Sequence, residues 1–181
     1  MIAIIGESGS GKSTLQEMLI KNDSRYKKVI KYTTRPKREN EKDGADYHFI
    51  SESRFEKLIK KDFFAEYAKY RDWFYGIARE DCVGSQYNVA ILTPVGLRTL
   101  LRLGVEVTSI YLYVDRRSRL INILARGDNV DEAYRRNLSE VGQFDGIVDE
   151  VNYVIDNTAF HMDEEQAFQC LYNILNYKDS I

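Results

Sequence analysis

The fold is decided by the stretch Gly6-Glu7-Ser8-Gly9-Ser10-Gly11-Lys12-Ser13-Thr14. The apolar run before it, residues 2–5, has the character of a buried strand, and apolar residues recur at helical spacing after it. In a strand, loop and helix of this kind, glycines let backbone N–H groups turn toward an oxyanion, and the helix start adds partial positive charge. We therefore predict that all nine residues bind the phosphates of a nucleotide.

Two side chains of this loop have roles that the spacing predicts. Lys12 can reach the outer phosphates of a bound triphosphate, so it is a candidate catalytic residue. The Ser13 hydroxyl is expected to bind Mg²⁺ between the β- and γ-phosphate oxygens. The alternative is an ordinary glycine-rich turn. It does not account for a nine-residue motif that stands between a strand-like segment and a segment with helical spacing of apolar residues.

Length and composition favour one α/β domain. A chain of 181 residues with 44% hydrophobic residues can bury a core and is too short for two typical domains. Cys82 and Cys170 have no metal-type spacing, which favours a reducing compartment over a disulfide framework or a zinc site. Without a signal-peptide pattern or an apolar run near the ~20 residues of a membrane span, we expect a cytoplasmic protein with no membrane partner.

The net charge of −2 is unevenly distributed along the chain. Residues 21–42 hold nine Lys or Arg against three acidic residues, and residues 128–165 hold two Arg against eleven acidic residues. The basic segment is expected to bind something anionic, whereas the acidic one argues against a nucleic-acid partner and for a local phosphate site. The alternative for both segments is a solvated charged face.

Residues 28–32 are predicted to form a second strand, which would deliver the basic segment 33–38 to the carboxyl end of a parallel sheet, where open α/β folds bind ligands. Together with the phosphate loop, residues 33–49 resemble the nucleoside-monophosphate segment of guanylate kinases, which have a TTR run, then PR, GE, a glycine and a DY-x-F run. The residues in register are Arg35, Arg38, Glu41, Gly44, Asp46, Tyr47 and Phe49. Lys37 and Asn40 replace the usual Pro and Gly, and residues 63–67 and 73–76 look like the family's EF-x-EW and YYG stretches.

The resemblance implies a fold and an activity. The fold is a P-loop NTPase-type parallel sheet flanked by helices, with an inserted monophosphate-binding lobe and a helical lid. A single domain, 1–181, would comprise a core of about residues 1–32, 87–126 and 146–181, a lobe of about 33–86 and a lid of about 127–145. The activity is transfer of the ATP γ-phosphoryl group, with Mg²⁺, to GMP or dGMP. The expected partners are therefore small-molecule nucleotides.

The lobe residues suit a monophosphate. The guanidinium groups of Arg35 and Arg38, with the phenolic hydroxyls of Tyr47 and Tyr75, can hold a phosphate dianion. The resemblance gives Glu66 the role of accepting two N–H bonds from guanine; the alternatives are an exposed acid for Glu66 and simple packing for Tyr75. The predicted acceptor-binding set is Thr34, Arg35, Arg38, Glu41, Tyr47, Glu66, Tyr75 and Thr93, with Glu41 orienting an arginine.

Three positions depart from the family pattern. Ile77 stands where relatives place a Ser or Thr that helps to read guanine, and Ile91 and Thr93 stand where the family usually carries two aspartates. A single carboxylate, Glu66, would discriminate less between bases than a fuller set of polar groups. Two alternatives follow: a kinase for a different ribo- or deoxynucleoside monophosphate, and a catalytically silent guanylate-kinase-like module that binds a partner protein.

Residues 126–138 resemble the family's lid, in which one arginine closes over ATP and another over the transferring phosphoryl group. Arg126 matches the first. At the second position the register gives Asn137, directly after Arg135 and Arg136. Because one helical position is about 100° of rotation, a slight lid shift would bring Arg136 in. Arg126, Arg136 and Arg135 therefore join Lys12 as candidate catalytic residues; the alternative for Arg135 and Arg136 is a solvent-facing pair.

Overall fold

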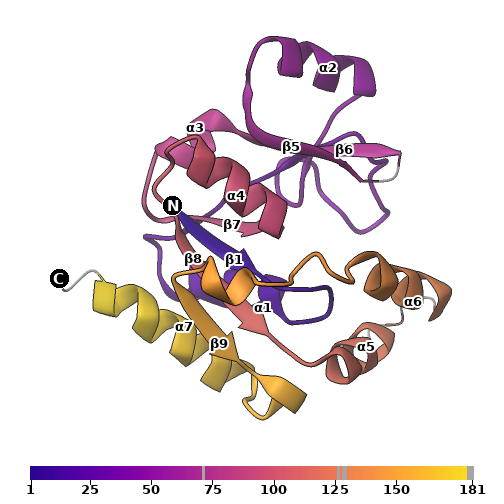
Figure 1. Ribbon diagram of the computed structural model, residues 1–181. Helices are drawn as coiled ribbons and strands as arrows, with labels where there is room; N and C mark the ends of the chain where they lie inside the picture. Colours follow the sequence, from indigo (N-terminus) through magenta and orange to yellow (C-terminus); the bar gives the residue numbers. More distant parts are fainter. Residues whose placement is uncertain (71, 126, 128–129, 179–181) are drawn as a thin grey trace.

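The computed structural model describes residues 1–70, 72–125, 127 and 130–178. Its main sheet has five strands, all paired in parallel, in the order β2 (Lys27–Lys28), β7 (Asn88–Leu92), β1 (Ile2–Ile5), β8 (Thr108–Tyr113) and β9 (Tyr153–Asp156). The central strand β1 runs directly into the phosphate loop, and Figure 1 shows helices on both faces of the sheet. This arrangement confirms the predicted fold class.

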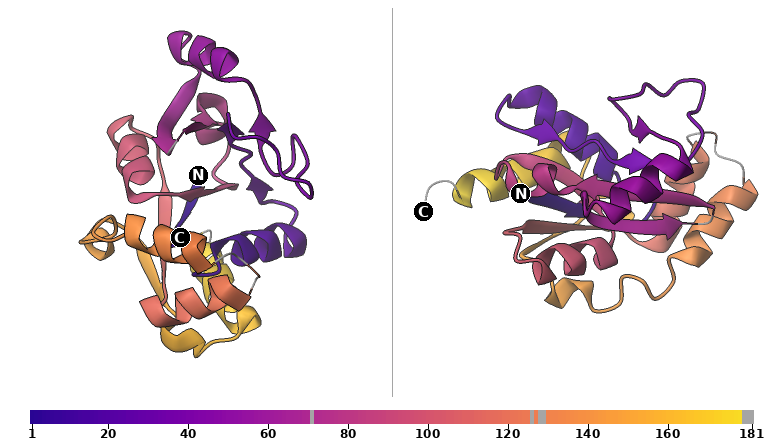
Figure 2. Two further views of the ribbon diagram at one scale, coloured as in Figure 1. Left: turned by 90° about the vertical axis from the view of Figure 1, so that its right-hand side faces the viewer. Right: turned by 90° about the horizontal axis from the view of Figure 1, so that it is seen from above.

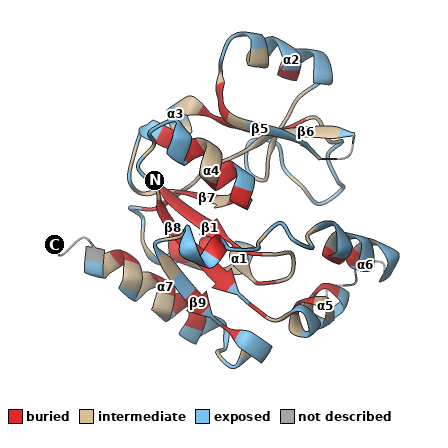
Figure 3. Cartoon of the chain, in the orientation of Figure 1, coloured by how far each residue is buried: buried red, intermediate tan, exposed pale blue. Residues whose placement is uncertain are grey.

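The main sheet is buried on both faces, as the continuous apolar strands predicted. Ile2 and Ile4 of β1 pack in one core with α1 (Lys12–Asn22) and α7 (Glu164–Lys178). Ala3 and Ile5 point the other way and pack in a second core with Leu97 of α4 (Pro94–Arg102). Figure 3 shows β1 buried along its whole length. The rigid centre of the molecule thus holds the loop that follows β1.

The inserted lobe has its own sheet, in the order β4 (His48–Phe49), β3 (Tyr32–Thr33), β6 (Trp73–Ala78) and β5 (Phe64–Tyr70). Its helix α2 (Glu52–Lys60) is capped by the Ser51 hydroxyl, which accepts a hydrogen bond from the Arg54 N–H. Phe55 of α2 is fully buried and stacks on Phe64 with 4.3 Å between ring centroids. Phe55 and Phe64 therefore form the core of the lobe, and Figures 1 and 2 show the lobe set apart from the main sheet.

The prediction of one continuous strand over residues 28–32 is wrong, because the segment is divided between two sheets. The strand β2 ends at Lys28 in the main sheet, and β3 begins at Tyr32 in the lobe sheet. The Val29 N–H still donates to the Val89 carbonyl, whereas the Lys31 carbonyl accepts from the His48 N–H of the lobe. The chain crosses from the core to the lobe between these two contacts, and Lys31 lies at the crossing.

The remaining elements lie around these two sheets. They are α3 (Arg79–Val83), α5 (Arg116–Ala125), α6 (Val130–Ser139), η1 (Ile147–Asp149) and η2 (Thr158–Phe160). The strand β8 begins at Thr108, and before it the Val105 N–H bonds the Leu100 carbonyl at the end of α4. Within the described ranges, the helices are too short or too polar for any of them to cross a bilayer.

Candidate active site

A cleft of about 690 Å³ brings together segments that lie far apart in the sequence. The phosphate loop contributes Ser8, the lobe contributes most of the predicted acceptor residues, and the segment after α6 contributes Glu140 and Gln143. The predicted acceptor residues along its walls are Arg35, Arg38, Glu41, Tyr47, Glu66, Tyr75 and Thr93. Thr34 is the exception: its hydroxyl accepts the Phe74 N–H at 2.9 Å, so the side chain fastens the basic segment to β6.

The phosphate loop is tightly packed around its glycines. Gly9 has φ +84°, and a Cβ at this position would lie 2.6 Å from the Arg119 carbonyl oxygen, so a side chain there would clash. The Lys12 Nζ donates to the Glu7 carbonyl at 2.7 Å, which holds the ammonium group at the mouth of the loop. Ser13 is exposed in the first turn of α1. Ammonium, hydroxyl and helix N-terminus therefore converge where phosphate oxygens would bind.

A second cavity, of about 320 Å³, lies on another side of the same loop. Ser10, Gly11 and Thr14 line it from the loop, and Asn157 and Phe160 line it from the turn that follows β9. Its lining combines polar side chains, such as Asn122 and Asp163, with apolar ones, such as Leu112 and Met162. The cavity is suited to the nucleoside part of a triphosphate whose phosphates reach the loop.

The basic segment of the lobe is organised by Glu41. One carboxylate oxygen accepts from Arg35 Nη2 at 2.6 Å, and the other accepts from the Arg38 N–H at 2.8 Å. Burial opposes ionisation of this carboxyl, but the hydrogen bonds from Arg35 and Arg38 lower the Glu41 pKa overall. The Arg35 guanidinium also lies over the Tyr47 ring at 5.6 Å from its centroid. Glu41 thus orients Arg35, as predicted.

The tyrosines beside this arginine also line the cleft. The rings of Tyr47 and Tyr75 meet edge to face with 6.0 Å between centroids. Burial, and then the neighbouring Tyr75, raise the pKa of Tyr47, so its hydroxyl keeps its proton and can donate to an anion. Arg35, Tyr47 and Tyr75 can together hold a phosphate group.

The far end of the cleft contains opposite charges that sequence reasoning only half predicted. Glu66 of β5 lies against the first turn of α4, since a Cβ at Gly96 would come within 3.2 Å of its Oε1. Lys31 lines the same cleft. Burial raises the pKa of Glu66, and the nearby charge of Lys31 opposes this shift. Burial lowers the pKa of Lys31, and the charge of Glu66 opposes that shift in turn. The prediction missed Lys31, although a lysine two residues before the TTR run was visible.

The positions that depart from the family pattern have structural roles. Ile77 is fully buried in the core that contains α4, directly across the sheet from Glu66. Thr93 is the N-cap of α4, and its hydroxyl accepts the Gly96 N–H at 3.1 Å while the residue lines the cleft. Ile91 belongs to β7 of the main sheet. Of these three positions, only Thr93 lines the cleft, where it presents a hydroxyl.

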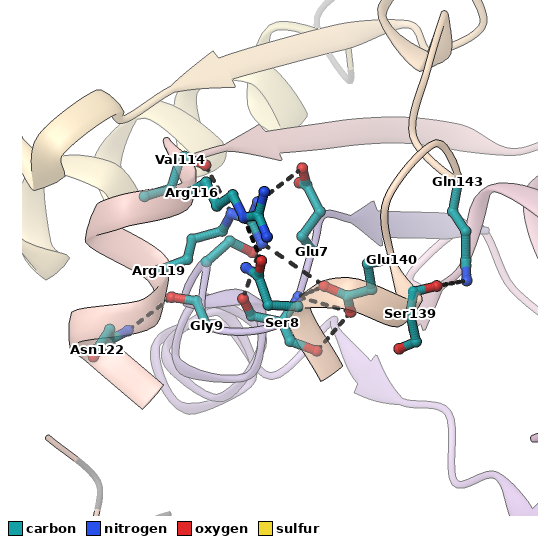
Figure 4. A network of polar contacts seen from close by, with 12 residues as sticks. Glu7, Ser8, Gly9, Val114, Arg116, Arg119, Asn122, Ser139, Glu140 and Gln143 are labelled. Carbon is teal, nitrogen blue, oxygen red and sulfur yellow. Dashed lines mark hydrogen bonds and ion pairs between the residues drawn. The ribbon is translucent and has the colours of Figure 1, made fainter. Parts of the chain in front are cut away.

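The segment after α6 is attached to the phosphate loop through Glu140, as Figure 4 shows. Its carboxylate accepts from the Ser8 N–H at 3.0 Å and from the Ser8 hydroxyl at 2.6 Å. Buried Arg119 lies 3.7 Å from Glu140 and 3.4 Å from Glu7, and the Tyr111 hydroxyl donates to Glu7 at 3.0 Å. Sequence reasoning missed this network, because Glu7 and Ser8 of the loop lie over a hundred residues from their partners in the sequence.

The lid arginines remain predictions. Arg126 lies outside the described residues, and so does the side chain of Arg136. Arg135 is exposed on α6. Asn137, at the second arginine position of the register, is buried and accepts a hydrogen bond from the Arg116 Nε.

The model of the guanylate kinase family matches residues 1–165. The chain belongs to the guanylate kinase family. The guanylate kinase of Nostoc sp. is 31% identical to this family member, and the match covers 94% of this chain and 86% of the relative. The guanylate kinase of Aliivibrio fischeri is 32% identical, and the match covers 84% of this chain and 77% of the relative. The crystal structure of guanylate kinase from Anaplasma phagocytophilum has the same fold, with a TM-score of 0.70, 21% identity, and coverage of 98% of this chain and 85% of that one.

Proposed function

We propose that this protein is a guanylate kinase that transfers the γ-phosphoryl group of ATP to GMP or dGMP, giving ADP and the corresponding diphosphate. One observation carries the proposal: Ser8 of the phosphate loop lines the same cleft as Arg35, Arg38 and Glu66. A donor held at the phosphate loop and an acceptor held by the lobe would therefore meet in one cleft. Membership of the family supports the same activity.

The acceptor phosphate would be held by Arg35, Arg38, Tyr47 and Tyr75. Because Glu41 already fixes Arg35, the guanidinium fork loses little side-chain entropy when a phosphate binds. Glu66 would accept hydrogen bonds from the N1–H and N2–H groups of guanine. These contacts position the acceptor oxygen for attack on the γ-phosphorus.

The donor triphosphate would be held by the N–H groups of the phosphate loop and by Lys12, with its nucleoside in the cavity beside Thr14 and Asn157. The exposed Ser13 hydroxyl fits a Mg²⁺ ion, which keeps several waters and takes its other ligands from phosphates. When bound, Mg²⁺ supplies charge neutralisation at the β- and γ-phosphates. The reducing conditions of the cytoplasm suit the unpaired Cys82 and Cys170.

Transfer would proceed directly between the two nucleotides. An oxygen of the acceptor phosphate attacks the γ-phosphorus, the bond to the bridging oxygen breaks, and ADP leaves with the electron pair. Lys12 and an arginine of the lid, Arg126, Arg135 or Arg136, stabilise charge on the equatorial oxygens. Closure of the lid over the cleft would exclude water and suppress hydrolysis of ATP.

A second candidate function is a kinase for a different nucleoside monophosphate. The burial of Ile77 and the use of Thr93 as a helix cap favour it, because both reduce the polar groups available to a guanine base. The two candidates differ only in the acceptor base and make the same demands on the phosphate loop.

The test is ADP formation from Mg-ATP against a panel of ribo- and deoxynucleoside monophosphates. We expect turnover with GMP or dGMP well above that with any other acceptor, and its loss in Lys12→Ala. Turnover with another acceptor alone would support the second candidate. No turnover with any acceptor would contradict both and favour a module that only binds.

A further inference from the structure

Lys31 is held at the point where the chain crosses from the core sheet to the lobe. The preceding Val29 is tied to β7 by its N–H, and the Lys31 carbonyl accepts the His48 N–H at 2.8 Å. Both ends of this short crossing are therefore fixed, one in each sheet. The Lys31 side chain lines the acceptor cleft together with Glu66 and Thr93.

Lys31 and Glu66 line the same cleft without forming a hydrogen bond or an ion pair with each other. Within residues 1–70, 72–125, 127 and 130–178, neither side chain makes a hydrogen bond or an ion pair, although each acts electrostatically on the other. Both are half-buried. Polar groups removed from water are normally hydrogen-bonded, so this end of the cleft is suited to a ligand that presents an acceptor to Lys31 and donors to Glu66.

The Watson–Crick edge of guanine has this pattern. Its O6 is an acceptor, and the adjacent N1–H and N2–H groups are donors. A lysine ammonium group only donates and a carboxylate only accepts, so Lys31 matches O6 while Glu66 matches the two N–H groups. Adenine has the reverse order, because its N6 amino group would face Lys31 and its N1 acceptor would face Glu66.

We propose that Lys31 is a specificity-determining residue that donates a hydrogen bond to the 6-oxo oxygen of the acceptor purine, opposite Glu66. The inference rests on the proposed function and deepens it by naming the group that reads O6. It also supplies the donor that Ile77, an apolar residue buried in the core, does not provide. The resulting selectivity is for 6-oxopurines over 6-aminopurines.

The experiment compares acceptors that differ at this oxygen. The ratio kcat/KM is measured for GMP, IMP and 6-thio-GMP with the wild-type enzyme and with Lys31→Met, which keeps the aliphatic stem and removes the donor. Sulfur is a far weaker acceptor than oxygen, and IMP retains O6 while lacking the N2 amino group. We expect Lys31→Met to lower kcat/KM for GMP and IMP by about 10- to 100-fold, and for 6-thio-GMP by much less.

Two further variants serve as controls. Lys31→Arg keeps a donor and is expected to restore part of the preference for GMP over 6-thio-GMP. Lys27→Met changes an exposed lysine of β2 and is expected to leave all three values unchanged. An equal fall for all three acceptors in Lys31→Met would overturn the inference, because a lysine that contacts the phosphate or only supports the fold cannot distinguish O6 from sulfur.

Failure of this inference is distinguishable from failure of the proposed function. Turnover of GMP by the wild type with no change of preference in Lys31→Met would refute the role of Lys31 alone. Where turnover is absent, calorimetry gives the Kd values for GMP and 6-thio-GMP. Lys31→Met is then expected to weaken the binding of GMP much more than the binding of 6-thio-GMP. Absence of GMP binding to the wild-type protein would overturn both proposals.

Discussion

At the scale of single residues, the site depends on charges that are oriented before any ligand binds. Glu41 is the clearest case, because its two oxygens hold the side chain of Arg35 and the backbone of Arg38. An arginine held in this way presents its remaining N–H groups in a fixed direction. The sequence predicted this role for Glu41, since the residues involved are only a few positions apart.

Replacing Glu41 with Gln is expected to weaken acceptor binding selectively. The amide cannot form the charged hydrogen bond to Arg35, so the guanidinium would have to be ordered when GMP binds. We expect KM for GMP to rise by about 5- to 20-fold and KM for ATP to stay within about twofold. Steady-state kinetics with each substrate varied in turn checks this, and an equal rise in both KM values would contradict it.

The pH dependence of acceptor binding is expected to report on Glu66. Burial raises its pKa above the ordinary value of 4.5, and Lys31 opposes the shift. Because guanine needs the ionised carboxylate, KM for GMP should rise as the pH falls through this raised pKa, at a higher pH than an ordinary glutamate would give. Glu66→Gln should raise KM for GMP at neutral pH and remove this step from the profile; a step that persists in Glu66→Gln would assign it to another group.

At the scale of elements, the lobe and the lid segment depend on different contacts. The lobe is held together by aromatic stacking around Phe55, whose ring lies 4.3 Å from that of Phe64 and 5.2 Å from that of Phe74. The lid segment is instead attached by the polar contacts of Glu140 with Ser8 and Arg119. The two elements should therefore respond to different substitutions.

The variant Phe55→Ala is expected to impair the lobe and spare the donor site. Truncating a fully buried aromatic residue costs about 3–5 kcal/mol, and here the cavity would open between α2 and the lobe sheet. We expect binding of GMP to be lost while Kd for ATP changes by less than about twofold. Calorimetric titration with each nucleotide tests this, and a parallel loss of ATP affinity would show that the lobe and the core do not respond separately.

Removing the Glu140 carboxylate is expected to strengthen ATP binding. This group occupies the Ser8 N–H, one of the loop donors that a triphosphate would use. If the contact contributes about 1 kcal/mol net, Glu140→Ala should lower Kd for ATP by about fivefold. Glu150→Ala, which removes a partly exposed ion pair with Arg98, is the matched control and should leave Kd unchanged. Weaker ATP binding by Glu140→Ala would mean that this carboxylate supports the loop.

Elements were predicted well wherever local pattern determines them. The phosphate loop and the helix α1 that follows it depend on residues within a few positions of one another. The division of residues 28–32 between two sheets was not predictable, because strand-forming residues stand on both sides of Lys31, Val29 and Ile30 before it and Tyr32 after it. The contacts of Arg119 and Glu140 escaped prediction for a similar reason: a charged residue in a helical pattern looks the same whether it is solvated or paired across the fold.

At the scale of the whole molecule, the phosphate loop contributes residues to both of the cavities proposed for the two nucleotides. The smaller cavity lies beside Ser10 and Thr14, and the larger cleft runs from Ser8 to the lobe. The loop that follows β1 lies between them, at the carboxyl end of the most buried strand. A core that holds this loop rigid, with a lobe and a lid packed beside it, suits a reaction in which positioning supplies most of the rate.

The most direct measurement is inhibition by one molecule that would occupy both cavities, adenosine and guanosine joined through their 5′ positions by five phosphates. Linking the two halves makes the second binding step intramolecular, so the compound should bind at least about 100-fold more tightly than GMP alone. If a donor and an acceptor lie side by side across the phosphate loop, inhibition should be competitive with both ATP and GMP. Inhibition competitive with only one of them would contradict direct transfer across the cleft.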